Sequence, residues 1–165
     1  MAVTHTPPVS AQHKDSSNTG SRGDRRSRRD QLGGAVPRVV VMENLRERGH
    51  FLQERLVQER FEVGMLEDAR GALQWLSEGL VPRRGSDVEL LICNARMLGD
   101  SGLDLLARWC AAHPHVPVLL VSAFTNAKLR ARMARIPGGV VLDQDFSVED
   151  VRATAVSMVE TSVTS

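Results

Sequence analysis

Short apolar runs alternate with amphipathic segments along the chain from Pro37 onward. Each run is continuous and rich in β-branched and aliphatic side chains, which is typical of a strand buried on both faces. The predicted strands are Arg38–Met42, Phe61–Leu66, Val88–Cys93, Pro117–Ser122 and Gly139–Leu142.

The segments between these runs carry apolar side chains at the spacing of amphipathic helices. In the first of them, we expect one apolar side that consists of Phe51, Leu52, Leu56 and Val57. The further helices are expected over Ala69–Leu80, around Leu103–Cys110, over Asn126–Arg135, and after Ser147, which is a predicted N-cap.

A strand followed by a helix, repeated five times, predicts an α/β fold with a doubly wound, five-stranded parallel sheet, (βα)5. We expect this domain to span residues 37–161, with residues 162–165 disordered. In such sheets the functional site lies at the carboxyl ends of the strands, where the winding reverses. The polar residues at these ends are Glu43, Asn44, Glu67, Asp68, Asn94, Ser122 and the segment Asp143–Asp145.

The first 36 residues differ from the rest in composition. They hold eight apolar side chains, and six Lys or Arg against three Asp, whereas the remainder has 15 basic and 17 acidic side chains. Such a segment buries too little apolar surface to fold, so we expect a disordered basic tail. Its segment Ser21–Asp30 has five Arg and leaves open a role as a nucleic-acid adaptor. We expect no nucleic-acid binding apart from this tail.

Composition excludes several classes of protein. No apolar run among the 165 residues approaches the roughly 20 residues of a membrane helix, and the N-terminus lacks the apolar stretch of a signal peptide. Cys93 and Cys110 are too few for a disulfide framework, so we expect buried free thiols and a cytoplasmic protein. His113 and His115 flank Pro114, and we expect a solvated turn there rather than a metal site.

The segment Asn94–Leu105, NARMLGDSGLDL, resembles the Asp-x-x-Met-Pro-x-x-(Asp/Gly)-Gly-x-(Asp/Glu)-(Leu/Phe) segment of the receiver domain of bacterial two-component response regulators. RVVVMEN, VLLVSAF and VVLDQDFSVEDV resemble the ends of the first, fourth and fifth strands in that family. The resemblance covers about residues 37–160 and implies the flavodoxin-like receiver fold. It also implies phosphoryl transfer from a histidine kinase to an Asp beside bound Mg²⁺.

This sequence departs from the family at the positions that carry the chemistry. The resemblance places Asn94 at the phosphoacceptor position, Glu43 and Asn44 at the acidic pair, Ser122 at the switch hydroxyl, Gln144 at the lysine, and Val141 at the aromatic switch position. A carboxamide is a poor nucleophile and cannot form an acyl phosphate, and a divalent ion would meet fewer carboxylates. We therefore expect a degenerate pseudo-receiver with no catalytic residue, no metal and no cofactor.

The family resemblance also implies a partner surface on the helix Asn126–Arg135, the fifth strand and the last helix. Its candidate residues are Lys128, Arg130, Arg132, Arg135 and Val141. We expect a protein partner with an acidic surface, or a homodimer through this surface. The expected function is that of a stand-alone, atypical receiver that acts in bacterial signalling through phosphorylation-independent protein–protein interaction, and not an enzyme.

One alternative is a small flavodoxin-like enzyme or ligand-binding domain. It would use the crevice at the strand ends, with Glu43, Ser122 and Asp145 as polar contacts. A deep apolar pocket beside these residues would favour it, and burial of Met97 or Leu98 in the crevice would count against it.

Overall fold

The computed structural model describes residues 36–81, 87–123, 126–143 and 145–163. The chain divides into two units, residues 1–34 and 35–165, and the description below concerns the second. The expected disordered tail and the site position Gln144 lie outside the described residues.

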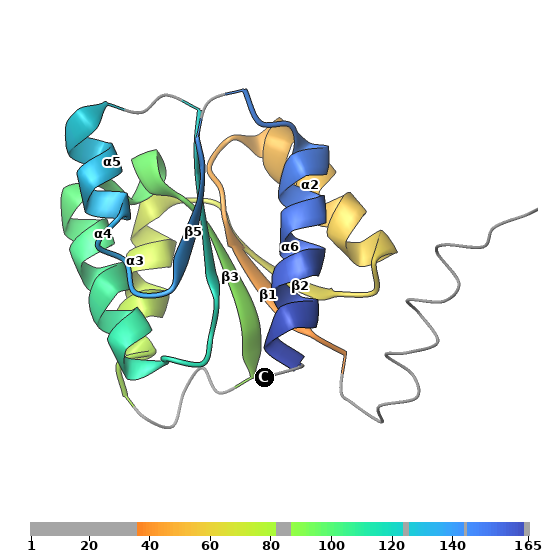
Figure 1. The fold of residues 1–165 in the computed structure, drawn as a ribbon, viewed down its shortest axis with the longest axis horizontal. Helices are drawn as coiled ribbons and strands as arrows, with labels where there is room; N and C mark the ends of the chain where they lie inside the picture. Colours follow the sequence, from red (N-terminus) through yellow and green to blue (C-terminus); the bar gives the residue numbers. More distant parts are fainter. Residues whose placement is uncertain (1–35, 82–86, 124–125, 144, 164–165) are drawn as a thin grey trace, which may run out of the picture. The chain divides into compact units, whose positions relative to one another are not determined.

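The second unit follows the alternation expected from the sequence. Its elements are β1 (Arg38–Met42), α2 (Arg46–Gln58), β2 (Glu62–Leu66), α3 (Ala69–Glu78), β3 (Val88–Asn94), α4 (Ala95–Ala112), β4 (Val118–Ser122), α5 (Ala127–Met133), β5 (Gly139–Asp143) and α6 (Val148–Val163). The strands form one parallel sheet in the order β2-β1-β3-β4-β5. Figure 1 shows α3, α4 and α5 on one face of this sheet, and α2 and α6 on the other. The predicted fold class is confirmed.

Each face of the sheet has its own hydrophobic core, because side chains alternate along a strand. Val40 and Met42 of β1 belong to the core under α3 and α4, whereas Val39 and Val41 belong to the core under α2 and α6. The winding reverses between β1 and β3, which are neighbours in the sheet. The residues that follow these two strands are therefore held side by side at one end of the domain.

The apolar side predicted for α2 is wrong in two of its four members. Leu52 and Leu56 are buried, but Phe51 is 50% and Val57 is 54% exposed. The buried face instead includes Gly49, which lies three residues before Leu52 on the same side of the helix. A glycine adds no apolar side chain to the hydrophobic pattern. The pattern therefore placed the apolar side of α2 toward Phe51 and Val57, away from Gly49.

Two boundaries also differ from the expected ones. The third helix, expected around Leu103–Cys110, begins earlier in the structure: α4 starts at Ala95, directly after β3, and is interrupted at Gly99, whose φ of 67° is non-helical. Such a left-handed conformation favours glycine. At the other end, α6 continues through Ser162 to Val163, beyond residue 161, where we expected the domain to end, and residues 164 and 165 lie outside the described residues. The expected N-cap is present, since the Ser147 hydroxyl accepts a hydrogen bond from the Asp150 N–H at 3.1 Å.

His113 is buried, and the expected solvated turn is wrong at this residue. Its side chain is 6% exposed, and its Nε2 lies 2.7 Å from the carbonyl oxygen of Gly79. The ring stacks on Trp109 with a centroid distance of 4.3 Å, and Trp109 also packs against Trp75 at 5.5 Å. An aromatic cluster therefore joins the C-terminal ends of α3 and α4. Trp109 Nε1 is buried and has no hydrogen-bond partner among the described residues.

Both cysteines are free and buried, as predicted. Burial raises the pKa of the Cys110 thiol to about 11 and that of the Cys93 thiol well above its usual value. Because the thiolate is the reactive form, neither side chain should react in the folded domain at pH 8. We expect iodoacetamide to label both cysteines rapidly in urea and only at the rate of unfolding in buffer. Rapid labelling of folded protein, followed by mass spectrometry, would contradict this expectation.

Candidate functional site

The candidate site lies at the carboxyl ends of β1, β3 and β4. Three polar side chains are buried there: Glu43 is 2%, Asn94 is 7% and Ser122 is 1% exposed. Glu43 directly follows β1, whereas Asn94 and Ser122 are the last residues of β3 and β4. The parallel register brings these ends to one edge of the sheet, as predicted. Asn44, the other member of the pair at β1, is exposed.

Asn94 uses both parts of its carboxamide. Its Nδ2 donates a hydrogen bond to Glu43 Oε1 at 3.0 Å. Its Oδ1 accepts hydrogen bonds from the backbone N–H groups of Arg96 at 3.1 Å and Met97 at 3.4 Å, and so caps the first turn of α4. A carboxylate at this position would retain the cap and lose the donor. Asn94, which the sequence resemblance places at the phosphoacceptor position, therefore makes structural contacts that suit a neutral amide.

Glu43 has three described partners. Besides Asn94, its Oε1 accepts a hydrogen bond from the Leu45 N–H at 3.0 Å. Its Oε2 lies 3.9 Å from the guanidinium of Arg48, a side chain that is 27% exposed. Arg48 also lies over the ring of Phe146, 5.2 Å from its centroid, which is a cation–π arrangement. The hydrophobic pattern did not indicate a role for Arg48, because a charged residue outside the apolar side of a helix is expected to be solvated.

The donor set does not fit the divalent metal of the receiver family. A hard cation prefers several oxygen ligands with negative charge, and Glu43 is the one buried carboxylate among the described residues of this edge. Both of its oxygens already face positively polarised groups, namely the amides of Asn94 and Leu45 and the guanidinium of Arg48. In the described part of the chain, no three His, Cys, Asp or Glu residues are grouped to hold a metal ion.

The other acidic residues of the strand ends have different partners. Asp68 caps α3, since its Oδ1 accepts a hydrogen bond from the Gly71 N–H at 2.6 Å. Asp143 pairs with Arg130 at 3.1 Å. Asp145 is exposed and has a left-handed backbone with a φ of 42°. None of these observations brings a second carboxylate to Glu43.

Most of the candidate basic partner surface is paired within the domain. Lys128 lies 3.3 Å from Asp100, and Arg132 lies 3.2 Å from Asp100 and 3.0 Å from Asp104. These ion pairs join α5 to α4, and the pair of Arg130 with Asp143 joins α5 to β5.

Beyond these pairs, Arg135 is exposed. Val141 is half-buried and packs against the core, whereas its neighbour Val140 is 41% exposed on the edge strand β5. The surface therefore combines a mostly neutralised charge with an exposed apolar side chain.

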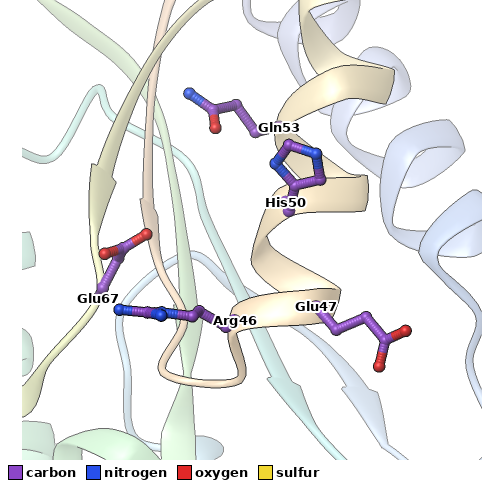
Figure 2. Close-up of a pocket in the computed structure, with 5 residues that line it drawn as sticks. All are labelled: Arg46, Glu47, His50, Gln53 and Glu67. Carbon is purple, nitrogen blue, oxygen red and sulfur yellow. The ribbon is translucent and has the colours of Figure 1, made fainter.

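A surface hollow lies outside the strand-end site. It has a volume of about 550 Å³ and is lined by Arg46, Glu47, His50, Gln53 and Glu67. Arg46, Glu47, His50 and Gln53 belong to α2. Figure 2 shows Glu67, from the segment after β2, beside the end of the Arg46 side chain, whereas Glu47 points away from it. The side chains that line the hollow are polar, so it is not the deep apolar pocket that would favour the enzyme alternative. Met97 and Leu98 are buried in the core, at 9% and 3% exposure, which counts against that alternative.

None of the described helices is both long enough and apolar enough to cross a membrane. No family model matches the sequence, and no curated protein matches it.

Comparison with solved structures shows the fold. A CheY-like response regulator receiver domain from Methanospirillum hungatei JF-1 superposes with a TM-score of 0.65 at 11% identity, over 79% of this chain and 98% of that chain. The signal receiver domain of an HD domain-containing protein from Pseudomonas fluorescens Pf-5 gives 0.61 at 22% identity, over 79% and 100%. The receiver domain of HemR from Leptospira biflexa gives 0.61 at 20% identity, over 74% and 94%. The described unit of this chain therefore has the flavodoxin-like fold of response regulator receiver domains.

Proposed function

We propose that this chain is an atypical receiver domain that acts in signalling by binding a protein partner, without phosphoryl transfer. The observation that carries the proposal is the hydrogen bond from Asn94 to Glu43, at 3.0 Å. In this arrangement the residue at the acceptor position is a neutral amide whose donor and acceptor atoms are both engaged.

Aspartyl phosphorylation requires a carboxylate oxygen that attacks phosphorus and releases the leaving group of the donor. The lone pair of an amide nitrogen is delocalised into the carbonyl group, so this nitrogen is a poor nucleophile. The carbonyl oxygen of Asn94 accepts two backbone hydrogen bonds. The resemblance also puts Gln144 at the position of the lysine that would pair with the phosphoryl oxygens. Each of these features supports a domain whose output does not depend on a phosphoryl group.

The proposed contact surface is formed by α5, β5 and α6. It presents the exposed Val140 on an edge strand and the exposed Arg135 after α5. Because Lys128, Arg130 and Arg132 already have acidic partners, apolar contact and strand-edge contact supply more of the recognition than net charge does. The partner is a second copy of this chain or another protein, and the reducing interior of a bacterial cell suits the two free thiols.

The absence of phosphoryl transfer is tested by incubating the full chain with acetyl phosphate and MgCl₂. We expect no increase in intact mass, whereas a receiver domain that retains its acceptor Asp, treated in parallel, gains a phosphoryl group. A phosphoryl adduct mapped to Glu43, Asn94 or Ser122 would overturn the proposal.

The contact surface is tested by sedimentation. If the chain is a dimer, Val140→Lys should shift it toward monomer, and Val57→Lys at an exposed position of α2, outside the proposed surface, should not. A dimer that tolerates Val140→Lys would exclude this surface as its interface.

A further inference from the structure

The carboxylate of Glu43 is buried, and among the described residues of the strand ends no other carboxylate is buried. A buried charge is costly unless an opposite charge and hydrogen bonds compensate for it. Glu43 is 2% exposed, and two neutral donors, Asn94 Nδ2 and the Leu45 N–H, contact the same oxygen, Oε1. The other oxygen, Oε2, faces the guanidinium of Arg48 at 3.9 Å. In the part of the chain that the structure describes, Arg48 is the basic residue that pairs with this carboxylate.

We propose that Arg48 is the built-in counter-ion of the strand-end site. It supplies from the chain itself the positive charge that the family resemblance assigns to a bound divalent ion and a lysine. This inference rests on the proposed function, since a site that accepted a phosphoryl group would need its cation position open. The site is then held in one charge-balanced state that requires no ligand.

The fold positions Arg48 through its neighbour in the sequence. Gly49 is buried, and a Cβ on it would lie 3.7 Å from Glu43 Cγ and 3.3 Å from the terminal methyl carbon of Met65. The first turn of α2 therefore packs directly against Glu43 and Met65. The backbone that carries Arg48 is therefore close to Glu43, the residue with which Arg48 pairs.

The guanidinium of Arg48 also lies over Phe146. Phe146 stands between β5 and α6 in the sequence, and its ring centroid is 5.2 Å from the central carbon of the guanidinium. A planar guanidinium can stack on a ring and face a carboxylate at once, which a lysine ammonium cannot do in the same way. The arrangement therefore joins α2 to the segment before α6 across the site.

Charge complementarity also accounts for the neutral residue at the acceptor position. A second carboxylate at Asn94 would contact Glu43 at the distance of the present hydrogen bond, 3.0 Å, and a single guanidinium would face two negative charges. One carboxylate, one amide and one guanidinium instead give a site without net charge. Arg48 balances the negative charge of Glu43, and the neutral Asn94 adds no second negative charge beside it.

A double-mutant cycle tests the inference. Arg48→Met retains the aliphatic length and removes the charge, whereas Glu43→Gln retains the shape and removes the opposite charge. We expect Arg48→Met alone to lower the equilibrium constant for folding about tenfold, and to lower it less than threefold in the Glu43→Gln background. The measurement is urea unfolding of the full chain followed by circular dichroism.

Two further variants sharpen the result. Arg46→Met changes an exposed arginine in the same helical turn, and we expect a change of less than twofold. Arg48→Lys keeps the charge and loses the planar stacking on Phe146, so it should fall between the wild type and Arg48→Met.

Equal effects of Arg48→Met in the two backgrounds would overturn the counter-ion role of Arg48, whatever the outcome of the phosphorylation test. Conversely, a phosphoryl adduct in the mass measurement would overturn the proposed function even if the cycle shows coupling. The two experiments therefore test the role of Arg48 and the proposed function independently.

Discussion

Replacing Gly79 by alanine is expected to destabilise the folded domain by about 3 kcal/mol. A Cβ at this position would lie 2.3 Å from Trp109 Nε1 and 2.8 Å from Trp109 Cδ1. The backbone of Gly79 is ordinary, with a φ of −73°, so the cost comes from the steric clash and not from backbone conformation.

The surroundings leave Trp109 little room to move. Its side chain is fully buried at 0% exposure and stacks on His113, whose Nε2 in turn contacts the Gly79 carbonyl at 2.7 Å. A shift of the indole would therefore also disturb the hydrogen bond that joins α3 to the end of α4. Since interiors are closely packed, we expect the whole cluster to lose order rather than one side chain to adapt.

Urea unfolding monitored by tryptophan fluorescence measures this effect. Gly64→Ala is a matched control in β2, because its Cβ would make an ordinary contact, 3.9 Å from Val40 Cγ2. We expect the control to change stability by less than about 1 kcal/mol. Equal unfolding midpoints for the two variants would show that the aromatic cluster yields to the extra methyl group.

The second large effect is expected for Asn94→Asp, which should destabilise the domain by about 2–4 kcal/mol at neutral pH. The change removes the donor to Glu43 Oε1 and puts a second negative oxygen in its place, 3.0 Å away. Both residues are buried, at 7% and 2% exposure, so water screens the repulsion weakly. The cap on α4 persists, because a carboxylate oxygen still accepts from the Arg96 and Met97 N–H groups.

The control for Asn94→Asp is the same change at Asn126. Asn126 is the exposed N-cap of α5, and its Oδ1 accepts a hydrogen bond from the Leu129 N–H at 2.8 Å. Aspartate serves equally well as an N-cap, so this variant should match the wild type within about 0.5 kcal/mol. Adding Glu43→Gln to Asn94→Asp should restore part of the lost stability, since one of the two carboxylates is then removed. Urea midpoints that are unchanged in Asn94→Asp would refute the electrostatic account of the site.

The sequence pattern predicted the sheet well because the strands are unambiguous. β3 and β4 are continuous apolar runs with no competing helical spacing, and their predicted bounds agree with the structure within one residue. The helices were less well defined by pattern. In α2 a glycine occupies a buried position, so Phe51 and Val57 were assigned to a face that they do not share with Leu52.

The burial of His113 could not be predicted from its neighbours in sequence. His113, Pro114 and His115 read as a polar turn, and the contacts that bury His113 come from Gly79 on another helix end and from Trp109 one turn earlier. Histidine is apolar on its ring faces and polar at its nitrogens, so tertiary contacts decide its environment.

The strand-end residues of the site were predicted, and the pairing between them was not. Position after a strand sufficed to select Glu43, Asn94 and Ser122, because parallel strands bring their ends together. Arg48 was missed because its pairing with Glu43 depends on how α2 packs against the end of β1, and a hydrophobic pattern does not define that packing. Glu43 is the one acidic residue of its pair at the end of β1, and this is the sequence signal for a nearby basic side chain such as Arg48.

The hydrogen bond between Asn94 and Glu43 also bears on how such a domain changes over many generations. If Asn94 is replaced by aspartate first, two buried carboxylates oppose each other, and if Arg48 is lost first, Glu43 loses its counter-charge. Either of these two changes alone is therefore expected to give a less stable protein. Folding stability by itself would then favour keeping the two residues together, whatever selection acts on the function of the domain.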